Sequence, residues 1–196
     1  MMHLALISTL ILGAALNVVG LKINTTRHEA PIVRGNPTDV YYEVSLLYKT
    51  STKVRGWLIG TPSKDGVGVE IRANFWGFPD EGPYQYHIHE APIPANGDCA
   101  AAGPHLDPYK RGETPPCDID APESCQVGDL SGKHGPIWIA PGEAFVVKYT
   151  DFFLSTSPAN PAYFGNRSIV LHTANGTRLN CGNFREDPSN CCRGNH

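Results

Sequence analysis

Four histidines are spaced so that they could bind a transition metal together. His87 and His89 alternate within the segment 84–90, which reads YQYHIHE, and His105 and His172 follow later in the chain. In an extended strand, side chains two residues apart project from the same face, so the first two imidazoles would stand side by side. Such a pair is either half of a metal site or two ordinary surface residues, and the rest of the chain has to distinguish the two.

Short β-strands are the elements that would position these histidines. In the segment 67–75, apolar residues alternate with polar residues and glycine, which is typical of a strand with one face in the core. No segment beyond residue 20 repeats apolar residues with helical period. The 17 prolines and 20 glycines suit the turns of an antiparallel sandwich or barrel. Strands are predicted at 40–48, 54–60, 67–75, 84–90, 136–140, 144–153 and 168–172.

A long irregular segment, 91–135, separates two groups of these strands and is rich in Pro, Gly, Asp and Cys. Connections of this length usually carry function, and this one contains His105. His134, near its end, is predicted to be an ordinary loop residue, with an indirect contact to a metal site as the alternative.

The 196 residues are enough for one well-filled core. Residues 1–20 carry no charged side chain, and the apolar run from Leu4 to Leu16 is too short to span a bilayer. We therefore predict a cleaved signal peptide at 1–20, a lead-in at 21–37, one folded domain at 38–184 and a surface tail at 185–196. No other segment is apolar enough to cross a membrane, and no lipid-anchor signal is expected at the C-terminus.

Two further features agree with secretion to the extracellular space or the cell wall. The six cysteines, at 99, 117, 125, 181, 191 and 192, suit an oxidising compartment, although buried free thiols are the alternative. Cys117 and Cys125 are predicted to pair within the long loop, whereas the partners of the adjacent Cys191 and Cys192 stay open. Candidate glycan sites lie at Asn24, Asn166 and Asn175. The formal net charge of −3, without a long basic run, argues against a nucleic-acid partner.

Several separated motifs resemble one known family. The stretches YHIHE, CAAAGPHLDP, VGDLSGKHG and IVLHTANGTRLNCG follow one another in the order and context of the copper/zinc superoxide dismutase superfamily, and the resemblance covers about residues 40–184. It implies an all-β fold, an antiparallel Greek-key sandwich or barrel.

The same resemblance implies the roles of individual residues. His87, His89, His105 and His172 would bind one copper ion, for which imidazole is a suitable ligand. Arg178 would guide the superoxide anion to the metal, because its guanidinium is always charged and offers several donors. Cys99 and Cys181 would form the disulfide of the family.

The chain departs from the zinc-containing members at two places. Glu113 and Gln126 stand where two zinc-binding histidines are expected, so only Asp129 would remain beside His105 and no zinc is expected. Only six positions lead from His172 to Arg178, so the long electrostatic loop that covers the copper is absent. Both departures resemble the copper-only superoxide dismutases, extracellular enzymes known chiefly from fungi and oomycetes.

This resemblance implies conversion of superoxide to O2 and H2O2, with His105 leaving the copper on reduction and carrying a proton. Gln126 and Asp129 are expected behind the ligands, because a hydrogen-bond partner normally fixes the ring of a metal-binding histidine. The best-known members of the group carry Glu at the position of Gln126. Either Asp129, Glu123 or Glu113 therefore supplies the missing carboxylate, or the pH range of activity is narrower.

Two other functions compete with this prediction. A non-catalytic copper-binding or copper-carrying module would need the four histidines but not Arg178. An adhesion domain would hold its histidines by chance and bind no copper. Because copper-only members are often monomeric, a monomer is the expectation.

Overall fold

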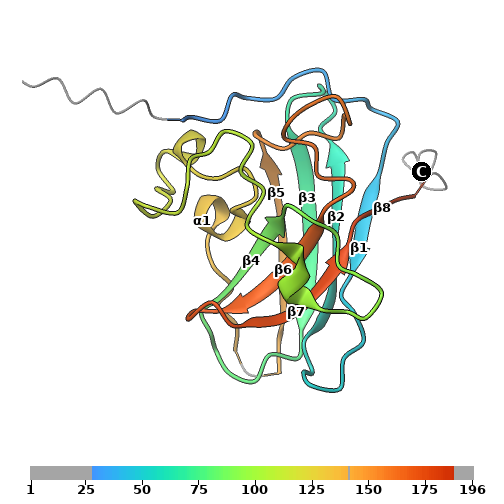
Figure 1. Cartoon of the computed structure of the whole chain (residues 1–196), viewed down its shortest axis with the longest axis vertical. Coiled ribbons are helices and arrows are strands. Elements are labelled where there is room, and N and C mark those ends of the chain that lie inside the picture. The colour runs from blue at the N-terminus through green and yellow to red at the C-terminus, as the bar shows by residue number, and fades with distance from the viewer. Residues whose placement is uncertain (1–27, 141, 188–196) are drawn as a thin grey trace, which may run out of the picture.

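The computed structural model describes residues 28–140 and 142–187, which form two antiparallel β-sheets (Figure 1). The larger sheet has the strand order β5 (Ala144–Asp151), β3 (Val69–Trp76), β2 (Arg55–Pro62), β1 (Tyr42–Ser45) and β8 (Arg185–Glu186). The smaller sheet has the order β4 (Tyr84–His89), β6 (Ser168–Thr173) and β7 (Arg178–Asn183). The described helices are short: η1 (Cys99–Ala102), η2 (Pro122–Ser124) and α1 (Leu130–His134).

Alternating side chains explain why the sheets pack face to face. Along β3 the residues from Val69 to Phe75 alternate between buried and more exposed positions, as the sequence pattern predicted. On β4, Tyr84, Tyr86 and Ile88 point into the same core, where aromatic and branched apolar side chains fill the space between the sheets. The predicted all-β fold is confirmed.

Two strand predictions were wrong in detail. The segment 136–140 forms only one bridge, between Ile137 and Tyr84, because the next N–H along β4, that of Tyr86, donates to the hydroxyl of Ser131 at 2.7 Å instead. Conversely, β7 was not predicted as a strand, since its sequence RLNCGN shows no apolar alternation. Its strand conformation comes from pairing with β6.

Packed residues reach beyond the predicted domain bounds of 38–184 at both ends. Ala30, Val33 and Asn36 are buried, and the side-chain amide of Asn36 donates to the carbonyl of Gly68 at 2.9 Å. At the other end, β8 pairs with β1. The predicted signal peptide, Asn24, Cys191 and Cys192 lie outside the described residues. Among the described helices, none has the length and apolar character needed to cross a membrane.

The long connection between β4 and β5 covers the histidine-bearing side of the smaller sheet (green to gold in Figure 1). It is tied to β4 by backbone hydrogen bonds, from Leu106 to the carbonyl of Ile88 and from Ile88 to the carbonyl of Gly128, both at 2.9 Å. A Cβ atom at Gly128 would come within 2.2 Å of that Ile88 oxygen, so only glycine permits this approach. His87 and His89 are consequently buried at 5% and 1% exposure, although they lie on the outer face of the sheet.

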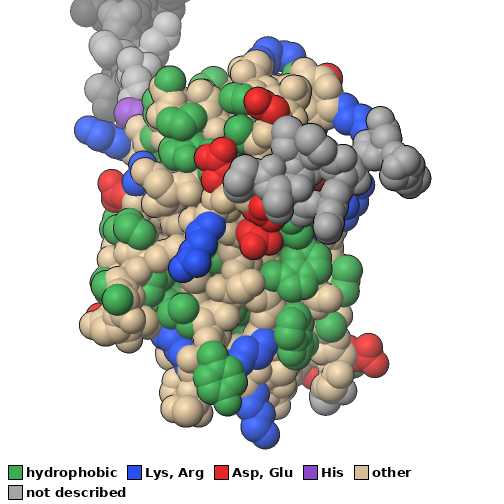
Figure 2. Space-filling model, turned by 90° about the vertical axis from the view of Figure 1, so that its right-hand side faces the viewer, with side chains coloured by type: hydrophobic (Ala, Val, Ile, Leu, Met, Phe, Trp, Pro, Cys, Tyr) green, Lys and Arg blue, Asp and Glu red, His purple; other side chains and the backbone are tan. Residues whose placement is uncertain are grey.

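Charged side chains of both signs are interspersed on the face shown in Figure 2, with hydrophobic groups between them. This distribution agrees with the mild net charge of −3 and shows no broad basic patch on that face. An extended basic surface is the usual footprint of nucleic-acid binding.

Candidate metal centre

The four predicted histidines meet at one point. His87 and His89 come from β4, His172 comes from β6, and His105 comes from the long connection. Strand register brings His172 opposite Gln85 on β4, and a single bridge places His105 opposite His89. Each ring offers one nitrogen, and these nitrogens all lie within 4.8 Å of one another. The fold therefore assembles the cluster from three separate parts of the chain.

Three of the rings are held from behind by hydrogen-bond acceptors. Nδ1 of His89 lies 2.9 Å from the carbonyl of Gly103, and Nδ1 of His172 lies 3.3 Å from the carbonyl of Gly176. Nδ1 of His105 lies 2.7 Å from Oε1 of Gln126. Because each partner is an oxygen acceptor, Nδ1 must carry the proton, and Nε2 is left with a free lone pair.

The ring of His87 has the opposite orientation, with Nε2 rather than Nδ1 facing a protein oxygen. Its Nε2 lies 3.4 Å from Oδ1 of Asp129, whereas its Nδ1 is buried and has no hydrogen-bond partner. A buried polar atom without a partner costs about 1–3 kcal/mol, so such an atom calls for an explanation. A metal ion bound by His87 Nδ1 and the Nε2 atoms of the other three rings would satisfy it.

The electrostatics of the cluster favour neutral rings. Burial, followed by repulsion from the neighbouring imidazoles, lowers the pKa of His87 far below its usual value. Burial also lowers the pKa of His89 to about 3 and that of His172 to about 4. Nε2 of His89 and Nε2 of His172 are only 3.1 Å apart. Neutral rings with converging lone pairs form the donor set that Cu(II) and other imidazole-binding metals prefer.

A cavity of about 280 Å³ gives access to these nitrogens. Arg178 lies at its wall, directly across the β6–β7 pairing from His172. The guanidinium donates to the carbonyls of Cys99, Ala100 and Gly103, the last at 2.7 Å. These bonds fix a positive charge beside the cluster. The cavity is lined by Gln85, His87, His89, Pro104, His105, Glu113, His172, Gly176 and Arg178.

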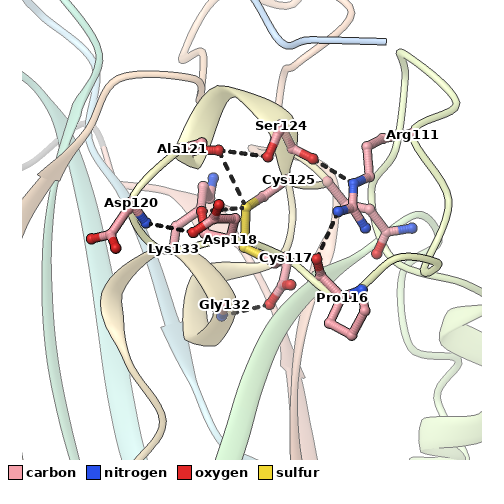
Figure 3. The surroundings of a disulfide bond; sticks show 12 residues. Arg111, Pro116, Cys117, Asp118, Asp120, Ala121, Ser124, Cys125, Gly132 and Lys133 are labelled. Atoms are coloured by element: carbon pink, nitrogen blue, oxygen red, sulfur yellow. Dashed lines mark hydrogen bonds between the residues drawn. A yellow bond between two sulfur atoms is a disulfide. The ribbon is translucent and has the colours of Figure 1, made fainter. Parts of the chain in front are cut away.

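Both predicted disulfides are present in the structure. Cys99–Cys181, with an S–S distance of 2.06 Å, joins η1 to β7 and so holds the carbonyls that anchor Arg178. Cys117–Cys125 closes the outer part of the long connection (Figure 3). There the guanidinium of Arg111 donates to backbone carbonyls, including that of Pro116 at 2.9 Å.

The side chains at the expected zinc position do not form a complete set of metal ligands. Asp129 accepts from the backbone N–H of Gly132 at 2.7 Å and caps α1, and Gln126 faces His105 through its amide oxygen. Within residues 28–140 and 142–187, the four-histidine cluster is the single group of metal-binding side chains found.

Of the carboxylates considered as candidates, that of Asp129 lies behind a predicted ligand, but this ligand is His87 rather than His105. Glu113 lines the cavity. Behind His105, the amide of Gln126 is followed by a carboxylate that was not considered, that of Asp107, which accepts from Nε2 of Gln126 at 3.3 Å. Its place two residues after His105 was the sequence signal that could have revealed it, because alternate residues of an extended segment share a side.

His134 was also predicted incorrectly as a loop residue. It is the last residue of α1, and its ring stacks on Tyr149 with a centroid distance of 3.8 Å. Its Nε2 lies 2.9 Å from Oδ2 of Asp151, away from the metal cluster. The candidate glycan sites Asn166 and Asn175 are exposed, and their modification stays a prediction.

Comparison with known proteins agrees with this geometry. A family model for copper/zinc superoxide dismutase (SODC) matches residues 54–184. The chain belongs to the copper/zinc superoxide dismutase family. All four histidines and Arg178 fall inside the matched region. The predicted family membership is therefore confirmed.

Relatives within the superoxide dismutase family include copper-only members from fungi. A cell surface Cu-only superoxide dismutase of Arthroderma benhamiae is 37% identical over 196 residues, which covers 87% of this chain and 52% of the relative. Cell surface Cu-only superoxide dismutase 5 of Candida albicans is 40% identical over 141 residues, covering 69% and 57% of the two chains. The chain thus spans about half the length of these curated relatives.

A solved structure within the family has the same fold. The Cu(II) form of superoxide dismutase 5 from Candida albicans aligns with a TM-score of 0.66 and 33% identity. The alignment covers 74% of this chain and 91% of that one. The predicted resemblance to copper-only superoxide dismutases is confirmed by these relatives.

Proposed function

We propose that this protein is a secreted, copper-only superoxide dismutase that converts superoxide to O2 and H2O2. The observation that carries the proposal is the convergence of four imidazoles beside a fixed guanidinium, in a cavity open to a small anion. The names of the relatives, which place those proteins at the cell surface, support an extracellular or cell-wall location. The two described disulfides suit the same compartment.

We assign one copper ion to His87, His89, His105 and His172. The unpartnered Nδ1 of buried His87 supports this assignment, because it lacks any protein acceptor or donor. Bound copper would supply one-electron redox chemistry, in which one superoxide is oxidised to O2 and another is reduced to H2O2. Asp129 and Gln126 hold His87 and His105 from behind, which fixes the nitrogen that each ring presents.

Arg178 would bind and orient the superoxide anion. Its guanidinium is anchored by three backbone carbonyls, so its position does not depend on the substrate. A fixed charge beside a cavity raises the local concentration of an anion and its rate of association. Because the net charge of −3 repels superoxide, this attraction must be local.

His105 would hold one of the two protons that the reduction of superoxide to H2O2 takes up, and the other would come from solvent. It comes from the long connection rather than from a strand, and it is the most exposed of the four ligands. Since Nδ1–H is bound to Gln126, Nε2 is the atom of His105 that could carry this proton, and only while it does not bind the metal. A monomeric state stays a prediction.

Metal analysis of the purified protein beside a superoxide assay tests the proposal. We expect one copper per chain after dialysis, no stoichiometric zinc, and catalytic removal of superoxide. Copper binding without turnover would instead favour a copper-carrying module, and an absence of bound copper would refute both functions.

Replacing Arg178 by Ile should lower kcat/KM for superoxide at least about tenfold, since electrostatic attraction of substrates changes association rates by about 10–10³. Copper content should not change, because Arg178 is not among the proposed ligands. Pulse radiolysis at several salt concentrations measures the effect. The rate of the wild type should fall as salt rises, whereas R178K should keep part of this salt dependence. Equal rates for R178I and the wild type would exclude a role of Arg178 in attracting superoxide.

A further inference from the structure

We propose that Asp107 is a positioning residue that orients the amide of Gln126 and thereby selects the tautomer of His105 that can bind copper. The inference rests on the proposed copper site and extends it to a residue outside the ligand set. Its evidence is a chain of hydrogen bonds that begins at a backbone turn and ends at Nδ1 of His105, the nitrogen opposite the metal-facing Nε2.

The carboxylate of Asp107 is held in place by the backbone that follows it. Its Oδ1 accepts from the N–H of Arg111 at 3.0 Å, and its Oδ2 accepts from the N–H of Gly112 at 2.8 Å. The turn needs left-handed backbone at Lys110 (φ 56°) and Gly112 (φ 76°). The same Oδ2 then accepts from Nε2 of Gln126 at 3.3 Å.

A carboxylate can only accept hydrogen bonds, so it decides which end of the Gln126 amide it faces. The NH2 group must point to Asp107, and Oε1 must therefore point to His105. An oxygen 2.7 Å from Nδ1 requires a proton on that nitrogen. Nε2 of His105 is then unprotonated and can donate its lone pair to a metal.

Without Asp107, the amide can rotate by half a turn and present its NH2 group to His105. Nδ1 would then have to accept, and the proton would move to Nε2, the nitrogen that faces the other ligands. A carboxylate at position 126 would not have this ambiguity, because both of its oxygens accept. The need for Asp107 thus follows from glutamine at position 126.

The experiment uses the full-length chain and a pair of variants. D107A removes the orienting carboxylate, and Q126E supplies an acceptor whose orientation does not matter. The tautomer of His105 in metal-free protein is read from its ¹⁵N imidazole shifts, and Cu(II) affinity is measured by competition with a chelator. D118A is the matched control, because Asp118 accepts the N–H of Asp120 at 3.0 Å in the same connection and does not contact Gln126 (Figure 3).

We expect only the Nδ1–H form of His105 in the wild type, in D118A and in Q126E. D107A should show a mixture that includes the Nε2–H form, and its Cu(II) affinity should fall by about tenfold, the lower end of the range for partners of metal ligands. D107A/Q126E should recover the Nδ1–H form and bind Cu(II) more tightly than D107A.

Persistence of the Nδ1–H form in D107A would overturn the proposal. The same mixture in D107A and D107A/Q126E, or loss of folding in both, would also overturn it, because Q126E cannot replace a carboxylate that only supports the turn. Loss of folding in D107A that Q126E repairs would support it. The tautomer is independent of turnover, so an inactive wild type would refute the dismutase and leave this test intact.

Discussion

Replacing Asp151 by Asn should lower the free energy of unfolding by about 3–5 kcal/mol, the usual cost of breaking a buried ion pair. Oδ2 of Asp151 lies 2.6 Å from Nζ of Lys133, and both side chains are fully buried. Nε2 of His134 lies 2.9 Å from the same oxygen. The substitution leaves the buried Lys133 ammonium without a counter-charge, because its other neighbours, the carbonyl of Val127 at 2.7 Å and the ring of Phe153, are uncharged.

Urea denaturation of the wild type and D151N measures this loss. E70Q is the matched control, because Glu70 pairs with Arg72 and Lys148 at the surface, and surface pairs contribute about 0–1 kcal/mol. The double variant K133M/D151N should recover much of the stability, since it leaves no buried charge unpaired. If D151N lost no more stability than E70Q, the proposed contribution of the buried ion pair would be contradicted.

The same carboxylate predicts how stability depends on pH. Burial alone would raise the pKa of Asp151, but the charge of Lys133 and the contact with His134 outweigh it and lower the pKa to about 2. As the pH falls, Asp151 of the unfolded chain therefore takes up a proton near its ordinary pKa of 3.8, before the folded protein does. The contribution of ionised Asp151 to the free energy of unfolding is therefore present above the pKa of the unfolded chain, and it is lost as the pH falls from there towards 2. D151N should lack this part of the acid dependence.

The sequence predicted those features that depend on local pattern. Alternation located β3 and the histidine-bearing strand β4, and separated motifs pointed to the four histidines that cluster in the structure. It did not predict β7, because the polar residues 178–183 become a strand only through pairing with β6. Strand formation there is a property of the assembled sheet rather than of the segment.

Contacts between polar side chains were harder to predict for a related reason. The link from Asp107 to Gln126 spans 19 positions, and the link from His134 to Asp151 spans 17. A hydrogen bond requires a donor–acceptor distance that is correct to within a few tenths of an ångström, whereas an apolar side chain can be buried against many different neighbours. Only the folded connection between β4 and β5 brings these groups into reach.

Replacing His89 by Gln should remove copper and activity together. His89 is 1% exposed, and its Nε2 belongs to the cluster, 3.1 Å from that of His172. Loss of an outer partner alone lowers metal affinity by about 10–100-fold, so loss of a ligand should lower it by more than about 100-fold. Cu(II) titration and the superoxide assay measure the two effects.

His134 provides the matched control for this substitution, because it is partly buried but lies outside the four-histidine cluster. H134Q should keep one copper per chain. Its free energy of unfolding should fall by about 1.5–3 kcal/mol, because the hydrogen bond from His134 to charged Asp151 is lost. Metal-free H89Q should stay folded, because the change also relieves two opposed lone pairs. Copper bound by H89Q as tightly as by the wild type would show that the ion lies elsewhere, and the four-imidazole centre would then have to be abandoned.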